Sequence, residues 1–318
     1  MTDLPEPADT QLTGLESDDW IDRLEELAEE AGRFDPLGPD HQAAFISGGS
    51  TLLVTFEDVE TIQRRPGAEP RGWRFVRDQG WSHLGIVARE EDWFRHRAIY
   101  GYFDQLTDEG FFDDFDRVLF FGIGGAGYAA AAYSVAAPGS RVLAVRPQAT
   151  LDPALAGWDG RWPAARRLDF TGRYGFAPDM LDAAEGAQIV FTPQQRNDHI
   201  HAALFARSHV DLLRVPNVGG RLERQLDQAE VLDRAILQAM DGTLTPGAFA
   251  ALIQPVRASA TYWRAVAQRA IKSGHEQMAA NLCAAAMQRF DDPWFGMRLK
   301  ELAARDIHPA RPVAPAAE

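Results

Sequence analysis

The feature that most constrains the fold is an apolar run that leads into closely spaced glycines and then into an alanine-rich segment. Residues 118–121 are Val-Leu-Phe-Phe, residues 122–127 carry four glycines, and residues 129–137 are mainly alanine. This order predicts a buried strand, a tight turn and a helix. Glycine lets the turn approach other backbone or a ligand closely, and the helix start offers unpaired N–H groups and a positive dipole end to an anion. The sequence therefore predicts an α/β protein with its functional site at this turn.

One interpretation of the turn is a dinucleotide site. Gly122, Gly124 and Gly127 satisfy the pattern G-x-G-x-x-G between a strand and a helix, which is the context that gives the pattern weight. The next expected strand, 141–145, ends at Arg146. Because an arginine at this place suits a 2′-phosphate, this interpretation predicts an oxidoreductase that uses NADP.

The other interpretation is a nucleophile elbow, the G-x-S-x-G turn, with Gly124 at the position of the serine. Residues 121–128, Phe-Gly-Ile-Gly-Gly-Ala-Gly-Tyr, resemble the α/β-hydrolase family, particularly members that read F-G-x-S-x-G-G-Y. The resemblance covers roughly residues 50 to 225, judged by the order of expected strands and helices. The family's nucleophile has a positive φ, which glycine adopts without steric cost.

The position of the turn in the chain favours the second interpretation. A dinucleotide fingerprint normally follows the first strand of its domain, whereas an elbow is expected in the middle of the sheet. Expected strands lie before the turn at 51–56 and 83–88, and after it at 141–145, 187–191 and 212–215. We therefore expect an α/β fold with a mainly parallel, α/β-hydrolase-like sheet sandwiched by helices, followed by a helical C-terminal region.

The resemblance implies positions for a catalytic triad. The acid should follow the penultimate strand, where Asp198 lies, and the histidine should follow the last strand, where Gly220 lies. With glycine at 124 and 220, both the nucleophile and the general base are missing, so we expect a non-catalytic protein that binds a small ligand or a protein partner. His199 and His201 are the side chains that could restore a base.

A second segment leaves the sheet at the same edge as the turn, and ligands of open α/β sheets bind at that edge. Residues 146–153 are similar to a Pro-Gln/Thr-Leu-Asp-Pro stretch of related hydrolase-like chains. The alternative is a turn held by Asp152 and Pro153. We expect a ligand site without a metal ion. The residues expected to line it are Gly122, Gly124, Gly125, Gly127, Arg146, Gln148 and Thr150.

Composition limits the partners. The chain of 318 residues carries 32 basic and 46 acidic side chains, and its net charge of −14 repels phosphate backbones and anionic lipid surfaces. We expect no nucleic acid partner.

No apolar run reaches the length of a membrane span, and the acidic N-terminus is unlike a signal peptide, so we expect a cytoplasmic protein without membrane insertion. The single cysteine, Cys283, excludes an internal disulfide and a four-thiolate zinc site and is expected to be buried.

Two further segments carry clustered side chains. Residues 92–106 are rich in aromatics at helical spacing and predict a helix whose packed face includes Trp93. Residues 158–174 combine arginines with aromatics, and aspartates such as Asp159 accompany them. We expect the second segment to be solvated and internally paired rather than a binding patch.

The expected organisation has four parts: a helical arm at 1–42, the α/β domain at 43–225, a helical region at 226–306 and a flexible tail at 307–318. The sequence predicts that Ser17 caps a helix in the arm and that Gly32 ends this helix. Residues 43–46 and 51–56 flank Ser-Gly-Gly-Ser at 47–50, which predicts a hairpin.

The same Ser-Gly-Gly-Ser is also similar to the S-G-G-x-D-S pattern of ATP-binding proteins such as phosphoadenylyl-sulfate reductases. The match ends at Thr51 and Leu52, and no helix is expected to follow. ATP or PAPS binding is therefore a further alternative, less favoured than the hairpin.

The helical region contains one unit that resembles a tetratricopeptide hairpin. The positions that carry this resemblance are Trp263, Ala270, Gly274, Ala279 and Ala286. One hairpin is too short for a solenoid, so we expect it to pack against the main domain. An interaction module for a partner is the alternative function of this region.

Overall fold

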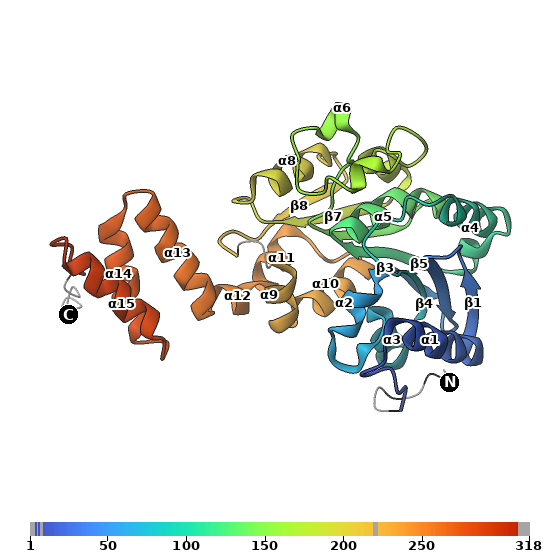
Figure 1. Ribbon diagram of the computed structural model, residues 1–318, viewed down its shortest axis with the longest axis horizontal. Helices are drawn as coiled ribbons and strands as arrows, with labels where there is room; N and C mark the ends of the chain where they lie inside the picture. Colours follow the sequence, from blue (N-terminus) through green and yellow to red (C-terminus); the bar gives the residue numbers. More distant parts are fainter. Residues whose placement is uncertain (1–3, 5, 7–8, 219–221, 311–318) are drawn as a thin grey trace.

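The computed structural model of the protein describes residues 4, 6, 9–218 and 222–310 (Figure 1). Its strands form one sheet of eight in the order β1-β2-β4-β3-β5-β6-β7-β8. The pairs from β4 to β8 are parallel, and β2 pairs antiparallel with β1 and β4. The strands are β1 (Gly32–Pro36), β2 (His41–Ile46), β3 (Thr51–Asp58), β4 (Ser82–Ala88), β5 (Arg117–Ile123), β6 (Arg141–Val145), β7 (Gly186–Phe191) and β8 (Val210–Arg214).

Helices cover both faces of the sheet (Figure 1). Alternate residues of β5 face opposite layers: Phe120 packs with α4 and α5, whereas Leu119 and Phe121 pack with α9 to α12. The sheet is therefore buried on both sides, which explains why its strands are continuous apolar runs. The helices are α1 (Ser17–Ala31), α2 (Val59–Gln63), α3 (Arg71–Gln79), α4 (Arg97–Asp108), α5 (Gly125–Tyr133), α6 (Pro153–Ala156), α7 (Ala177–Met180), α8 (Arg196–Leu204), α9 (Leu222–Gln228), α10 (Val231–Met240), α11 (Pro246–Leu252), α12 (Gln254–Arg257), α13 (Ala260–Lys272), α14 (Glu276–Met287) and α15 (Pro293–Ala303).

This architecture confirms the predicted fold class, a mainly parallel α/β-hydrolase-like sheet sandwiched by helices with a helical C-terminal region. Each of the five strands expected around the turn is present, and β6 has the expected bounds. The turn at Gly124 follows β5, which lies between β3 and β6 in the interior of the sheet.

The predicted hairpin at 43–56 is wrong. Strand β2 pairs with β1 and β4, whereas β3 pairs with β4 and β5, so β4 separates the two expected partners. The segment at 47–50 carries the chain past the start of β4: the Gly49 N–H donates to the carbonyl of Gly80 at 2.7 Å, and the Gly48 N–H donates to Ser82 Oγ at 2.9 Å. A side chain at Gly48 would meet the carbonyl oxygen of Trp81, which gives the glycine a packing role.

Two other boundaries differ from the expectation. The helix expected from residue 92 begins at Arg97, because Trp93 and Phe94 have left-handed backbone conformations with φ of 59° and 56°. The expected N-terminal arm contains α1, but it also supplies β1 and the first residues of β2 to the sheet. Strand β1 was not expected because Gly32–Pro36 is short and contains few apolar residues.

The C-terminal helices divide into two groups. Helices α9 to α12 pack on the sheet. Helices α13 to α15 enclose their own clusters, one of which buries Cys283, and extend away from the sheet (Figure 1). The expectation that the hairpin at 263–286 packs against the main domain is therefore wrong, because its apolar side chains are buried among α13, α14 and α15. Helix α13 reaches the loop after β8, where Arg269 donates to Asn217 Oδ1 at 3.1 Å. The tetratricopeptide likeness stays a prediction, and residues 311–318 of the expected tail lie outside the described residues.

No helix within the described part of the chain has the length and apolar character needed to cross a membrane.

The turn between β5 and α5 depends on two glycines that allow close backbone contact. A Cβ atom on Gly122 would lie 2.1 Å from the carbonyl oxygen of Ala126, and one on Gly127 would lie 3.1 Å from the carbonyl oxygen of Gly122. The first distance is impossible for a real side chain, and the second is tight. These glycines of the G-x-G-x-x-G pattern therefore serve the packing of α5 on the strand ends.

We predict that Gly122→Ala lowers the free energy of unfolding by about 3 kcal/mol or more, because the added methyl group overlaps backbone that cannot move independently. Urea unfolding followed by circular dichroism measures the effect. The control is Gly101→Ala on the exposed surface of α4, where nothing lies near the added atom; it should raise stability by about 0.5–1 kcal/mol. Equal urea midpoints for the two variants would contradict this account of the turn.

Candidate functional site

Gly124 lies at the apex of the turn, between β5 and α5. Its φ of 64° and ψ of −124° are strained for any residue with a side chain but not for glycine. Its N–H donates to the carbonyl of Val145 at 2.8 Å, and its carbonyl accepts from the Tyr128 N–H at 3.1 Å. The turn thus has the positive φ that the sequence predicted, and no side chain projects from its apex.

The carboxylate of Glu91 lies against this turn. Glu91 Oε1 accepts a hydrogen bond from the Gly125 N–H at 3.4 Å, and a Cβ atom on Gly124 would lie 3.5 Å from the same oxygen. In enzymes with a nucleophile elbow, the N–H of the residue after the nucleophile is a donor of the oxyanion hole. In this chain the N–H at the corresponding position, that of Gly125, donates to the carboxylate of Glu91, which follows β4.

Charged groups from three strand ends and the Gly125 N–H from a fourth meet at this edge of the sheet. The pKa of Glu91 is raised above its ordinary value, chiefly because its carboxylate loses solvent against the turn. The Gly125 N–H and Arg146 oppose this rise, whereas Asp58 at the end of β3 and the neighbouring Asp92 add to it. Desolvation and the two aspartates therefore disfavour the charged form of Glu91 relative to an exposed glutamate.

The indole of Trp93 covers the turn beside Glu91. The ring lies 3.2 Å from the position that a Cβ atom on Gly125 would take. Its Nε1 donates to Gln148 Oε1 at 2.7 Å, and Gln148 Nε2 donates to the carbonyl of Arg146 at 3.1 Å. Gln148 is buried, so both ends of its amide are committed to neighbours of the turn.

The loop that carries Glu91 and Trp93 is held from several sides. The left-handed conformations of Trp93 and Phe94 cost about 1–2 kcal/mol each. Asp92 offsets this cost, because it accepts from the Phe94 N–H at 2.9 Å and bonds with His41 Nε2 at 2.7 Å. The Tyr133 hydroxyl donates to the carbonyl of Phe94 at 2.6 Å. These contacts fix the two side chains over the turn.

Arg146 follows β6 and also has a left-handed conformation, with φ of 51°. Its guanidinium lies 2.6 Å from Glu223 Oε2 of α9 and 3.3 Å from Asp198 Oδ2 of α8. The cation that was expected to pair with a 2′-phosphate is therefore surrounded by two carboxylates. NADP binding stays a prediction of the sequence.

Asp198, the candidate acid, is buried in the first turn of α8. Arg161 donates to its Oδ1 at 2.5 Å, and Arg146 approaches its Oδ2. The partners that the structure places around this carboxylate are thus arginines. Gly220, at the position expected for the histidine, lies outside the described residues.

Of the two candidate rescue histidines, His199 is exposed and His201 is buried. His201 Nδ1 accepts from the Ala149 N–H at 3.1 Å, so the ring proton is on Nε2, which lies 3.0 Å from Asp159 Oδ2. Burial lowers the pKa of His201, which keeps the ring neutral at pH 7. Both nitrogens are committed, and neither is free to take a proton from a substrate.

The expectation that residues 158–174 are solvated is wrong for Asp159, although the expected pairing is present. Asp159 is buried and accepts hydrogen bonds from Arg161, Asn197 and His201. Burial alone would raise its pKa, but the hydrogen bonds and charge of Arg161, with the bond to His201, lower the pKa of Asp159 to about 2. This cluster ties the segment after β6 to α8.

The remaining predicted ligand residues also have internal contacts. Thr150 is buried, and its hydroxyl accepts from the Asp152 N–H at 3.1 Å, as the alternative interpretation of a turn requires. Asp152 in turn caps α6 through the Ala154 N–H at 2.9 Å. The structure thus brings Gly124, Gly125, Arg146 and Gln148 to one edge, and their ligand-binding role stays a prediction.

Within the described ranges, no group of three or more histidine, cysteine, aspartate or glutamate side chains is arranged to hold a metal ion.

The sequence matches no protein-family model and no curated protein. Among solved structures, the chain is similar to the Glycosylation Associate Protein complex from Streptococcus agalactiae, with 11% identity, 66% of this chain and 46% of that chain covered, and a TM-score of 0.45. It is similar to the capsule O-acetyltransferase of Neisseria meningitidis serogroup A, with 11% identity, 63% and 91% covered, and a TM-score of 0.42. For the esterase domain from a Rhodothermus marinus protein the values are 15% identity, 55% and 82% covered, and a TM-score of 0.38. Likenesses at this level carry no conclusion about activity, and the fold class follows from the strand order itself.

We predict that Asp159→Asn lowers the free energy of unfolding at pH 7 by about 2 kcal/mol, because Arg161 loses a buried anionic partner. Since the pKa of Asp159 is lowered from 3.8 to about 2 on folding, its stabilisation is present above pH 3.8 and is lost as the pH falls towards 2. The gap between wild type and variant should therefore shrink as the pH is lowered from about 5 to about 3.

Urea unfolding across this pH range measures the gap. Asp291→Asn, at an exposed position between α14 and α15, is the matched control and should leave the urea midpoint unchanged. An Asp159→Asn midpoint equal to that of the control would show that the buried cluster is not stabilising.

Proposed function

We propose that this protein is a non-catalytic, α/β-hydrolase-like protein that binds a small ligand or a protein partner at the carboxyl edge of its sheet. The observation that carries the proposal is Gly124, which has the positive φ of a nucleophile position and no side chain. A hydroxyl at this apex is what an acyl-enzyme mechanism requires.

The contact between Glu91 and Gly125 supports the same proposal from an independent direction. An oxyanion hole works by donating hydrogen bonds to negative charge that develops in the transition state. The Gly125 N–H donates instead to the Glu91 carboxylate. A second negative charge beside this carboxylate would be repelled, so the edge as it stands opposes the formation of a tetrahedral intermediate.

The surroundings of the candidate acid Asp198 and of the candidate base His201 also support a non-catalytic role. Asp198 is paired with arginines, and both nitrogens of His201 are committed. Because triad members act as a unit, losing the nucleophile alone removes most of their contribution. We therefore expect ester hydrolysis at the level of background.

A binding role fits the place of these residues in the fold. The loops after β3, β4, β5 and β6 meet at the carboxyl edge, where open α/β sheets bind their ligands. Trp93 and Gln148 are buried and fix the shape of this edge, and the Glu91 carboxylate lies beside them against the turn. A partner would be recognised by the shape and charge of this edge without chemical change.

The experiment is labelling of the purified full-length protein with a fluorophosphonate probe, with a serine esterase of known activity as positive control. We predict no stoichiometric labelling of the wild type and p-nitrophenyl acetate hydrolysis at the background rate, because the turn carries no hydroxyl. The Gly124→Ser variant tests whether the hydroxyl alone is missing; it should also stay unlabelled, because both nitrogens of His201 are engaged and Glu91 occupies the oxyanion donor.

One outcome would overturn the proposal. If one equivalent of probe attached to the wild type, and if substitution of the residue identified by peptide mapping abolished both labelling and hydrolysis, the protein would be an enzyme with a nucleophile elsewhere.

A further inference from the structure

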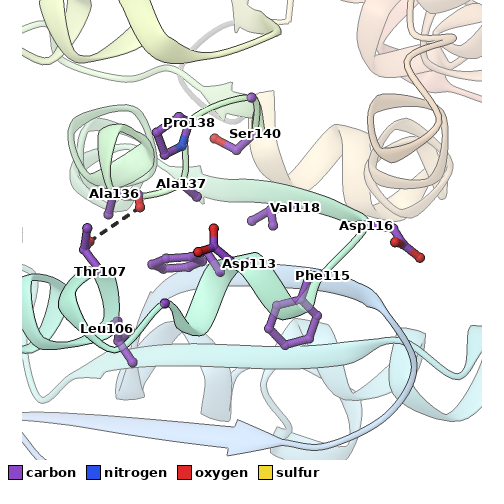
Figure 2. A pocket seen from close by; sticks show the side chains of 13 residues that line it. Leu106, Thr107, Asp113, Phe115, Asp116, Val118, Ala136, Ala137, Pro138 and Ser140 are labelled. Carbon is purple, nitrogen blue, oxygen red and sulfur yellow. Dashed lines mark hydrogen bonds between the residues drawn. The ribbon is translucent and has the colours of Figure 1, made fainter.

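A separate cavity lies at the opposite end of β5 from Gly124. It has a volume of about 310 Å³, within the range of small-molecule sites. It opens between the end of α4, the 3-10 turn η2 (Phe111–Asp114) and the segment that follows α5 (Figure 2). Its apolar walls are Leu106, Phe112, Phe115, Val118, Ala136 and Ala137.

Asp113 is the charged group that faces this cavity. Figure 2 shows its side chain in the middle of the lining, directed toward Ala137. Across the described residues, the Asp113 carboxylate has no hydrogen bond or ion pair, and no lysine or arginine lines the cavity. The cavity therefore presents a negative charge that no cation among the described residues neutralises.

The other polar side chains of the lining are already engaged. The Asp116 carboxylate points away from the cavity in Figure 2 and accepts from Ser50 Oγ at 2.5 Å. The Thr107 hydroxyl donates to the carbonyl of Phe103 at 2.8 Å, and the Ser140 hydroxyl donates to the carbonyl of Ser134 at 3.3 Å. Recognition of a ligand by side-chain charge thus depends on Asp113.

We propose that this cavity binds a small primary amine, with its ammonium group on Asp113 and its apolar part between Phe112, Phe115 and Val118. An ammonium group forms a charge-assisted hydrogen bond with a carboxylate, and the faces of phenylalanine rings attract a nearby cation. A neutral or anionic molecule of the same shape gains the apolar contacts but not the charge pair. This site is independent of the role proposed for the carboxyl edge.

The test is a titration of the full-length protein with benzylamine, followed by ¹H–¹⁵N NMR. We expect shift changes at Asp113, Ala137 and Ser140, and an affinity for benzyl alcohol about fivefold weaker than for benzylamine, because the alcohol lacks the charge. This comparison uses the wild type alone and does not depend on the folding of any variant. No binding of benzylamine up to about 20 mM, or changes confined to other parts of the chain, would overturn the proposal.

Two variants test whether the Asp113 carboxylate is the charge that binds the ammonium group. Asp113→Asn should weaken benzylamine binding about fivefold and make it equal to that of benzyl alcohol. Asp114→Asn, in the same turn but outside the lining, should bind as the wild type does. Both positions are exposed, so both variants should keep the wild-type urea midpoint. Unchanged affinity in Asp113→Asn would contradict the assignment.

Discussion

The close contact between α5 and the end of β5 is the constraint on which the rest of the site depends. Gly122 allows the carbonyl of Ala126 to approach to a distance that no side chain permits, and Gly127 lets the helix lie against the strand ends. The chain must then change direction within a few residues, and the positive φ of Gly124 makes this change of direction possible. As a consequence, the Gly125 N–H faces the carboxyl edge, where the loops after the neighbouring strands converge.

The protein's own side chains engage several of the polar groups at this edge. Glu91 accepts a hydrogen bond from the Gly125 N–H, and Gln148 accepts one from the indole N–H of Trp93. Arg146 lies between carboxylates from α8 and α9. The local strain at Trp93, Phe94 and Arg146 is consistent with an edge whose shape is determined by these contacts rather than by backbone preference. The Gly125 N–H and the Arg146 guanidinium at this edge are thus engaged by carboxylates of the chain itself.

The sequence was sufficient to predict most of the strands and the turn because these elements depend on local patterns. Strands such as β5 and β6 are buried on both faces and appear as uninterrupted apolar runs, and clustered glycines between an apolar run and an alanine-rich run indicate a strand, a turn and a helix. The hairpin prediction was wrong because two strands that are neighbours in the sequence need not pair with each other. In this sheet the later strand β4 lies between β2 and β3. Nothing in residues 43–56 indicates that β4 takes that place.

The side chains at the site were harder to predict because distant partners determine their positions. Trp93 is turned toward the site by Gln148, 55 residues further along the chain, and Asp159 is buried by its contact with His201, 42 residues away. One signal was available for Glu91: residues 90–92 are acidic and lie one residue after the buried strand β4, and side chains at that point of a parallel strand lie at the carboxyl edge.

The central claim is that the Glu91 carboxylate occupies the N–H that a hydrolase would use for its oxyanion. A pH titration of the Gly125 amide by ¹H–¹⁵N NMR tests it directly, in the wild type and in Glu91→Gln. The account predicts that the Gly125 signal titrates with a midpoint above the ordinary glutamate pKa of 4.5, because the carboxylate is desolvated, and that the glutamine variant abolishes this titration. A Gly125 signal that does not respond to pH in the wild type, or that titrates identically in the variant, would contradict it.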